Sequence, residues 1–414
     1  MKSHYFYLIC LLIIPLLPSQ YSLDVIGVHW FAFAIINISF LIYLFYIKQD
    51  FSFKSFLDFK PYFFLLLFIL FCAFSLFYSN NIELSIVDLS RVLTTFLSIV
   101  IFSSLIKTRV NLFILSLIVS FFLIFDVLFA IKPYVIFAYQ KGASFIDVLS
   151  SNYDPSILKG LTGNKNINAA FILIKVPFLF YVISSLKNKF ISVLTYLFLF
   201  TVLCLLFLLK ARAAYLSLFF ISLIFMLYSF FYSKKDLFYI PVLIVSFFCS
   251  SLIINSSKST SLSSEISSID FSNESSSSRF LLWKNALNSS YENNFIGLGL
   301  GNWKIESLPY WNKNGSAYIV PYHAHNDFFE LLAEIGILGV LSYMFIFFFS
   351  FFFIIKGFLK SKDIFYLIVG SSLFVYFVDA NLNFPIERAV MQIFFAFLLF
   401  LIHNKYADKS VNHK

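Results

Sequence analysis

The chain has 414 residues, of which 60% are hydrophobic and only 12% are charged, and its mean hydropathy is +0.88. This balance excludes a soluble domain. Long continuous apolar runs indicate membrane-spanning helices, because backbone exposed to lipid must satisfy its own hydrogen bonds. The formal net charge of +9 does not indicate nucleic-acid binding, since the basic residues are grouped in the connectors between apolar runs. We therefore predict an all-α integral membrane protein.

Twelve apolar segments are candidates for membrane spans. We expect them at residues 5–23, 27–47, 61–79, 86–106, 111–131, 168–186, 190–209, 212–232, 237–255, 327–355, 364–381 and 388–403. The first segment resembles a signal peptide, with a basic start and an apolar core. It has no convincing cleavage site of small residues, so we interpret it as a retained span.

The basic residues predict the topology. They gather in every second connector, whereas the short connectors 20–26 and 80–85 contain no Lys or Arg. The positive-inside rule places the basic connectors, and with them both termini, in the cytoplasm. A shorter outer segment then covers 132–167. The chain divides into an N-terminal bundle, a large outer loop, C-terminal spans and a cytoplasmic tail at 1–255, 256–326, 327–403 and 404–414.

The large outer loop has two kinds of sequence. It begins with a serine-rich tract, which is typical of a flexible segment. The following stretch "RFLLWKNALN" places a serine N-cap before an amphipathic pattern that ends at glycines, which predicts one or two short helices over the membrane face. No strand-turn-helix unit surrounds "GLGLGN" at 297–302, so we interpret it as a flexible turn and not as a nucleotide site.

Basic residues at membrane depth are candidate functional groups, because burying them is costly. Lys210 and Arg212 break the positive-inside pattern between two apolar runs, and a guanidinium suits a phosphate group. Snorkelling to the interface is the alternative for both. Arg91 follows Asp88 by one helical turn, so a self-satisfied pair explains it as well as an anion site. Arg279 opens the foldable part of the outer loop, where a solvated charge is the alternative. Weaker candidates are Lys175, Asp126, Glu387 and Arg388.

The densest polar cluster is "PYHAHNDFFELLAE", at the start of the tenth predicted span. His323 and His325 have no third metal-ligating residue nearby, so we expect no metal there. A histidine at the membrane–water boundary can instead accept a proton. Asp327, Glu330 and Glu334 share a helical face. For these acids, simple stabilisation of the helix N-terminus is the alternative to a role in a site.

Five motifs, taken in order, resemble one family. His325 and Asn326 are followed by nine residues, Gly336, two residues and Gly339, which resembles the signature of the bacterial O-antigen ligase and O-antigen polymerase superfamily. "LLKARAAYL" resembles its arginine motif, with Ala211 where Ser is usual. The other three are "SSRFLLWKNALNSSYENNFIGLGLGNW", "GLTGNKNINAAFILIKVPF" and "NFPIERAV". The similarity covers roughly residues 155–400.

The resemblance implies a glycan transferase of the bacterial inner membrane that acts at the periplasmic face. It implies an undecaprenyl-diphosphate-linked donor, inversion at the anomeric carbon, and neither metal nor cofactor. By matching position it implies a donor-diphosphate site of Arg212 and Arg279, joined more loosely by Lys210 and Arg91, a catalytic His325, and supporting residues His323, Asn326 and Glu330.

These residue types suit the reaction. Arginines neutralise a departing diphosphate without a metal, and a histidine with a pKa near 7 takes the proton of an acceptor hydroxyl. The sequence leaves three acceptors open: lipid A-core sugar, a second lipid-linked repeat, and Ser or Thr of a protein. The spacing of nine residues slightly favours the first, a ligase. A multi-span transporter or lipid flippase is the alternative of another class, although paired halves are not visible. A receptor or structural protein is a weaker one.

Overall fold

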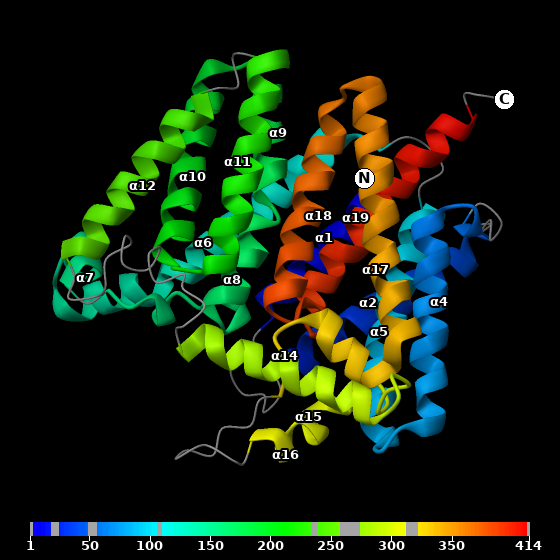
Figure 1. Ribbon diagram of the computed structural model, residues 1–414. Helices are drawn as coiled ribbons and strands as arrows, with labels where there is room; N and C mark the ends of the chain where they lie inside the picture. The colour runs from blue at the N-terminus through cyan, green and yellow to red at the C-terminus, as the bar shows by residue number, and fades with distance from the viewer. Residues whose placement is uncertain are drawn as a thin grey trace. The chain divides into compact units, whose positions relative to one another are not determined.

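A computed structural model describes residues 3–17, 25–48, 56–105, 110–151, 153–233, 238–256, 274–311 and 322–411 (Figure 1). Within these ranges the regular structure is helical, and no strand occurs. The chain divides into two compact units. Unit 1 comprises Met1–Val110, Phe271–Ser361 and Asp379–Lys414, and unit 2 comprises Asn111–Asp270 and Lys362–Val378. The predicted division at residues 255, 326 and 403 concerns membrane topology and stays a prediction.

Eleven helical segments of the described chain are long and apolar enough to cross a membrane, and each overlaps a predicted span. The prediction of an all-α membrane protein is therefore confirmed. Unit 1 contains α2 (Val25–Tyr46), α4 (Lys60–Phe74), α5 (Ile82–Leu105), α17 (Asp327–Ser361) and α19 (Ala389–Val411). Unit 2 contains α6 (Leu112–Lys141), α8 (Lys165–Leu173), α9 (Val176–Ser185), α10 (Lys189–Leu208), α11 (Arg212–Tyr232), α12 (Tyr239–Ser256) and most of α18 (Ile364–Leu382).

The first predicted span, 5–23, is shorter than expected. The apolar helix there covers Ser3–Leu16, formed by α1 (Ser3–Ile13) and a 3-10 turn. At 1.5 Å per residue this is less than the roughly 30 Å of a hydrocarbon core. Residues 18–24 lie outside the described chain. The Tyr7 hydroxyl ties α1 into unit 1, since it lies 2.6 Å from Asn37 Oδ1 and 2.8 Å from Ser98 Oγ.

Unit 2 also departs from one predicted boundary. Helix α6 continues to Lys141, although Pro133 lies inside it, so the predicted outer segment 132–167 begins as helix. After Gly142 the chain forms α7 (Phe145–Ser151) and two 3-10 turns, and then enters α8. Lys175 separates α8 from α9, which together form one predicted span.

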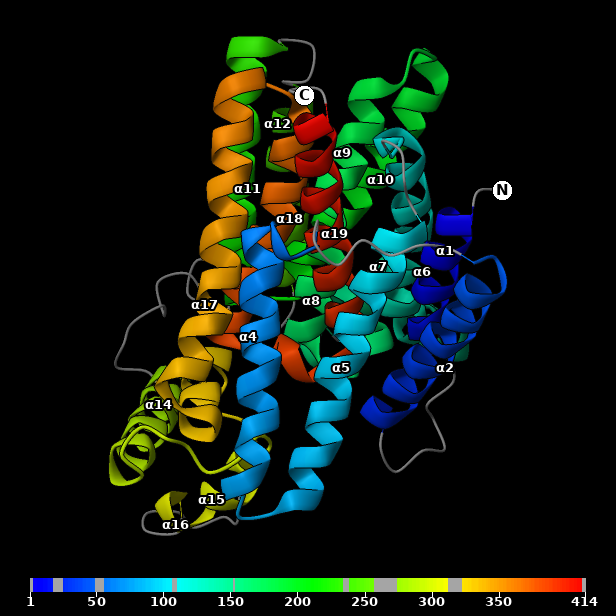
Figure 2. The same cartoon turned by 90° about the vertical axis from the view of Figure 1, so that its right-hand side faces the viewer.

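The outer loop carries helices, as predicted. They are α14 (Glu274–Glu292), α15 (Trp303–Glu306) and α16 (Leu308–Trp311), with α14 longer than the short helices we expected. Figure 2 shows all three beside the same ends of α4, α5 and α17, the helices of unit 1 that they accompany. The serine-rich tract at 257–273 and residues 312–321 lie outside the described chain. Helix α14 packs on α17, which brings the outer loop against the start of the tenth predicted span.

Helix α17 is broken near its beginning. Gly336 has φ 73° and ψ −174°, so a short helical segment from Asp327 to Ile335 precedes the long apolar part. This backbone conformation is open almost only to glycine. A β-carbon at Gly336 would also lie 2.3 Å from the carbonyl oxygen of Phe295. The glycine of the family-like motif is therefore required by the path of the chain.

The glycine-rich stretch 297–302 docks into this break. The Leu298 N–H donates to the Ala333 carbonyl (3.0 Å), and the Gly299 N–H donates to the Glu334 carbonyl (2.8 Å). A β-carbon at Gly297 would approach the Glu334 carbonyl oxygen to 2.3 Å. Our expectation of a flexible turn is wrong, because backbone hydrogen bonds fix this stretch and its glycines permit the close approach.

Candidate functional site

The segment that bears both histidines is anchored where α17 begins. Asn326 is the N-cap of α17, and its side-chain oxygen accepts hydrogen bonds from the N–H groups of Phe328 (2.9 Å) and Phe329 (3.2 Å). Its amide nitrogen donates to the Asn381 carbonyl at 2.9 Å. Asn326 therefore has a structural role: it caps the helix and ties it to the end of α18.

His325 is held in an unusual conformation. Its φ is 54°, in the left-handed region that non-glycine residues seldom adopt. Its ring meets the edge of the Phe384 ring, with centroids 5.2 Å apart. Its Nδ1 is buried and has no hydrogen-bond partner among the described residues. Backbone strain combined with an unsatisfied polar atom is a feature of functional sites and not of routine packing.

The surroundings of His325 keep its imidazole neutral. Burial is the largest cause, and the charges of Arg279, His323 and Arg388 add to it, so that the pKa of His325 is lowered to about 4. We expected a pKa near 7. The difference arises because the sequence shows neither how far this ring is buried nor which cations fold against it.

His323 lies in an acidic environment. Its Nδ1 is 2.9 Å from Glu330 Oε1, and the other oxygen of Glu330 accepts the Ala324 N–H at 2.7 Å. The His323 ring stacks on Phe384, with centroids 4.1 Å apart and an angle of 16° between the rings. The two histidines therefore share one aromatic neighbour, but His323 faces a carboxylate while His325 faces cations.

Helix α14 contacts the histidine segment through Trp283. The indole N–H of Trp283 donates to the Ala324 carbonyl (3.1 Å), and its ring stacks on Phe329 at 5.5 Å. Arg279 lies one helical turn before Trp283, and it is close enough to His325 to lower the pKa of the imidazole. Arg279 and His325 therefore lie within electrostatic reach of each other in unit 1. The roles that the resemblance implies for them stay predictions.

Arg91 is satisfied within unit 1. Its Nη1 lies 2.8 Å from Asp88 Oδ1 and 2.7 Å from Glu387 Oε2. Lys304 of α15 reaches the same two carboxylates, at 2.9 Å and 3.3 Å. This four-residue cluster joins α5, the outer loop and the 3-10 turn Pro385–Glu387. The cluster favours the alternative in which Arg91 serves only to pair with nearby carboxylates. A contact between Arg91 and the donor stays a prediction.

Lys304 was missed as a site residue. Burial opposes the charge of Lys304, but Glu387 and Asp88 raise its pKa well above the ordinary value. Burial likewise opposes the ionisation of Glu387, yet Lys304, His323 and Arg91 hold the pKa of that carboxyl below its usual range. One signal could have revealed Lys304: it is a lysine in an expected outer loop, against the positive-inside pattern.

The acids at the start of α17 are not exposed groups that merely balance the helix dipole. Glu334 is buried and accepts the Trp303 N–H at 3.1 Å. Asp327 is buried beside the Tyr343 hydroxyl and the Ile386 N–H, each 3.3 Å away. A small cavity in unit 1 is lined by Asp88, Arg91, Val92, Leu300, Glu330, Leu331, Glu334, Ile386 and Glu387. Glu330 and Glu334 therefore line this cavity inside the unit, whereas Asp327 does not.

The other predicted cations lie in unit 2. Lys210 is buried at the turn between α10 and α11, with φ 47°, and its ammonium lies 5.5 Å from the Tyr153 ring centroid. Arg212 is the first residue of α11, after Ala211. Burial of Lys210 does not fit a side chain that snorkels outwards. That these two cations act together with Arg279 and His325 stays a prediction.

Residues 197–344 match a family model described as O-antigen ligase. That stretch belongs to the O-antigen ligase superfamily. The resemblance that the motifs predict is thereby confirmed over this range. The match contains Lys210, Arg212, Arg279, His323 and His325. The motifs around 160–178 and 383–390 lie outside it. A comparison with curated proteins gives no match.

The chain is thus a multi-pass membrane protein in which residues 197–344 are similar to O-antigen ligases. In the described part of the chain, no three His, Cys, Asp or Glu side chains converge as metal ligands. Lys175 and Asp126 form a buried ion pair in unit 2, and the Lys175 ammonium lies 3.3 Å from the Phe171 ring centroid. These two weaker site candidates are therefore paired with each other.

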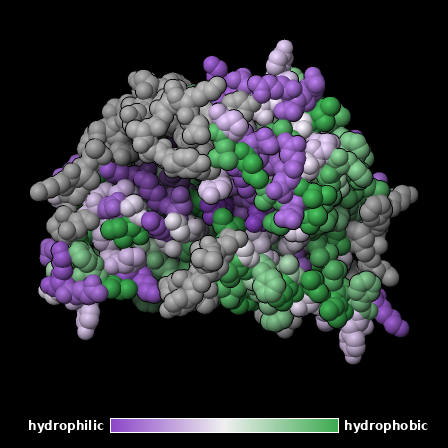
Figure 3. Space-filling view, turned by 90° about the horizontal axis from the view of Figure 1, so that it is seen from below, coloured by the Kyte–Doolittle hydropathy of each residue, from purple (hydrophilic) through white to green (hydrophobic). Residues whose placement is uncertain are grey.

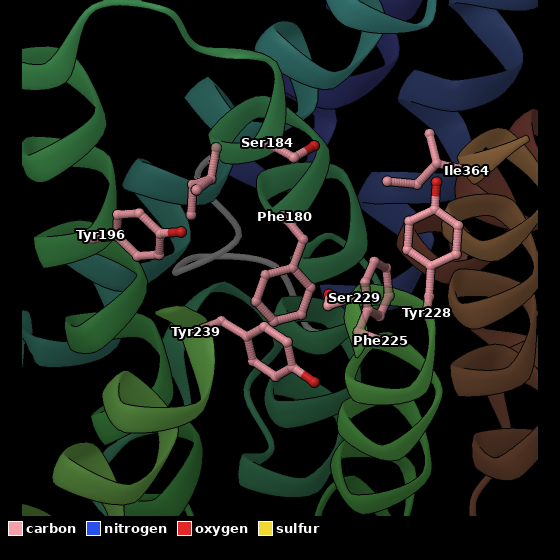
Figure 4. A pocket seen from close by; sticks show the side chains of 9 residues that line it. Phe180, Ser184, Tyr196, Phe225, Tyr228, Ser229, Tyr239 and Ile364 are labelled. Atoms are coloured by element: carbon pink, nitrogen blue, oxygen red, sulfur yellow. The ribbon is translucent and has the colours of Figure 1, made fainter. Parts of the chain in front are cut away.

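A second cavity lies wholly within unit 2. Figure 4 shows the aromatic side chains that surround it. It is lined by Phe180, Ile183, Ser184, Tyr196, Phe225, Tyr228, Ser229, Tyr239 and Ile364. These side chains carry no charge at neutral pH, so the cavity does not suit an anionic group such as a diphosphate. The histidine segment of unit 1 remains the better candidate for the reacting centre.

Proposed function

We propose that this protein transfers a glycan from undecaprenyl diphosphate to an acceptor hydroxyl at the periplasmic face of the bacterial inner membrane. The observation that carries the proposal is a neutral, strained His325 beside Arg279, inside the stretch that matches the O-antigen ligase model. The family match supports a glycan transferase in general. Donor, acceptor and side of the membrane are parts of the proposal.

On the donor side, the reaction requires positive charge at the leaving group. The bond between the anomeric carbon and a phosphate oxygen breaks, and undecaprenyl diphosphate departs with the electron pair. Arg279 lies at the site to stabilise that charge, and Arg212 is proposed to join it. Guanidinium groups supply this charge without a metal, in line with an inverting reaction that needs no cofactor.

On the acceptor side, a hydroxyl oxygen forms the new bond to the anomeric carbon and loses its proton. A neutral imidazole can take that proton, and His325 is neutral at physiological pH because its pKa is about 4. A bound diphosphate favours the protonated ring, since an opposite charge nearby raises the pKa of a histidine. His325 thereby becomes a stronger base when the donor arrives. His323, Asn326 and Glu330 position this segment.

We propose lipid A-core sugar as the acceptor, which makes the protein a ligase. A second lipid-linked repeat, as for a polymerase, and a protein hydroxyl, as for an O-oligosaccharyltransferase, are the alternatives within the superfamily. The support for a ligase is the spacing of nine residues between Asn326 and Gly336. The glycans of a deletion strain separate these cases: a ligase mutant accumulates unattached long chains, whereas a polymerase mutant attaches single repeats.

The periplasmic placement rests on the basic connectors, which put the histidine segment and α14 on the outer side. The cytoplasmic N-terminus additionally requires that the segment beginning with α1 crosses the membrane. Labelling of single cysteines from outside intact cells tests both parts.

Replacement of Arg212, Arg279 or His325 with Ala tests the site. Each variant is expected to insert normally and to lose glycan transfer. Wild-type product from all three variants in a membrane assay would refute the assignment. A flippase that merely moves the lipid would form no glycosidic product, so the same assay separates the two classes of function.

A further inference from the structure

Helix α14 has three distinct sides. Its buried side is small and largely polar, with Leu282, Asn285, Ala286, Ser289 and Ser290. Its second side is exposed and begins with Leu281, followed by the polar Asn288 and Glu292.

The third side is exposed and apolar. Phe280, Leu287 and Tyr291 are 43%, 41% and 74% exposed. Their spacing of seven and four residues aligns them along one edge of the helix. An outer-loop helix in water would be expected to bury this edge and expose its serines. Figure 3 views the molecule from the end that carries α14, where hydrophobic and hydrophilic side chains are both exposed.

The apolar edge continues beyond the helix. The Tyr291 and Phe295 rings lie 6.3 Å apart, and Phe295 and Ile296 are also exposed. Asn294 and Phe295 have φ values of 52° and 57°, so a bulky aromatic residue occupies the left-handed region. That conformation is unfavourable for a bulky residue, and it sets the direction in which Phe295 leaves the helix.

The same edge joins the surface of a membrane-spanning helix. The Ile337 N–H donates to the Phe295 carbonyl at 3.0 Å, just after the break in α17. Ile337 and Leu338 are exposed and begin the apolar part of α17. The exposed apolar edge of α14 is therefore continuous, within unit 1, with side chains of a helix that lipid surrounds.

We propose that this edge, formed by Phe280, Leu287, Tyr291 and Phe295, inserts into the outer leaflet of the bilayer that α17 crosses. Lipid is the occupant that the continuity with α17 favours over a protein partner. Aromatic side chains prefer the headgroup boundary, and Lys284 beside them can extend to lipid phosphates. Helices of this kind lie in the plane of the interface, with one face in the acyl region.

One consequence concerns the position of the candidate site. Helix α14 also carries Arg279, and its Trp283 holds the Ala324 carbonyl between the two histidines. A lipid-embedded α14 fixes the depth of Arg279 relative to lipid headgroups. The proposal itself concerns a surface, and it does not depend on the glycan transferase function.

The experiment uses nitroxide labels at four neighbouring positions. The four cysteines are first replaced, and then Leu287→Cys, Asn288→Cys, Tyr291→Cys and Glu292→Cys are labelled one at a time in the full-length protein. Each protein is placed in nanodiscs of phosphatidylethanolamine and phosphatidylglycerol. Collision with oxygen reports lipid, and collision with a water-soluble nickel chelate reports water. All four native side chains are exposed, so the labels do not disturb the core.

We expect oxygen to dominate at 287 and 291 and nickel to dominate at 288 and 292. The pairs 287/288 and 291/292 serve as matched controls, because each compares two faces of the same turn. Nickel access at all four positions would overturn the proposal. Exclusion of both reagents at 287 and 291 would also overturn it, since another protein surface would then cover the edge.

Discussion

The Nδ1 atom of His323 lies 2.9 Å from the carboxylate of Glu330, whose second oxygen accepts the backbone N–H of Ala324. One buried carboxylate thereby fixes both the ring of His323 and the backbone that leads to His325. The Phe384 ring contacts both imidazole rings, so one aromatic side chain fixes the positions of the two histidines relative to each other.

Glu330→Gln should lower glycan transfer by about 10- to 100-fold while the protein still folds. The substitution keeps the shape but removes a charge-assisted hydrogen bond worth about 1.5–3 kcal/mol. Product formation per inserted protein is the measurement. Glu306→Gln is the matched control, since Glu306 accepts a hydrogen bond from Asn80, which precedes α5, and not from either histidine. Equal activity of wild type and Glu330→Gln would contradict the positioning role.

The contribution of His325 to stability should fall between pH 7 and pH 5. The ordinary pKa of a histidine is 6.5 and that of His325 in the folded protein is about 4, so below pH 6.5 the unfolded state takes up the proton first. The stabilisation present above pH 6.5 is lost as pH falls towards 4, by about 2 kcal/mol at pH 5. His325→Asn should reduce the loss measured by thermal unfolding in detergent. An unchanged loss in this variant would show that His325 does not titrate in this way.

Arg91→Met should destabilise the fold by about 3 kcal/mol, because Asp88 and Glu387 lose one of their two cations inside unit 1. Adding Glu387→Gln should recover part of the loss, since fewer buried charges then lack a partner. Denaturation of both variants in detergent is the measurement. A stable Arg91→Met protein with a raised KM for the lipid-linked donor would instead support a donor contact.

Gly336→Ala should be more harmful than Gly163→Ala. Both residues have φ 73°, but a β-carbon at Gly336 meets a carbonyl oxygen at 2.3 Å, whereas Gly163 has open space around it. Backbone strain alone costs about 1–3 kcal/mol, and the clash at Gly336 adds to it. Thermal unfolding of the two variants gives the comparison. Equal melting temperatures would mean that the docking of the glycine stretch is not required.

The membrane architecture was predictable because it depends on composition and length. An apolar run predicts a membrane span whatever the helix packs against. Most of the membrane-spanning helices from α2 to α19 were therefore predicted with small errors in their boundaries. Helix α1 shows the limit of prediction from hydropathy, since the apolar pattern did not indicate where this helix ends. The larger error at α6 arose because an internal Pro133 does not end that helix.

The candidate site was predictable only in part. His325 and Arg279 stood out by motif, and unit 1 brings them together. The partners of these residues did not stand out. Phe384 and Trp283 reach the site through long-range folding, and Lys304 was marked only by its place in a loop that we expected on the outer side. The glycine-rich stretch was misinterpreted for a related reason: glycines that permit close backbone contact and glycines that provide flexibility are identical in sequence.

The most direct test of the central claim uses purified wild-type protein in lipid vesicles without any ion gradient. A lipid-linked glycan donor and a lipid A-core acceptor are added, and the products are separated by mass. The account predicts a glycosylated acceptor and free undecaprenyl diphosphate in equal amounts, and neither product with Arg279→Ala or His325→Ala. Consumption of no donor by the wild type, with this acceptor, a second lipid-linked repeat or a protein acceptor, would contradict it.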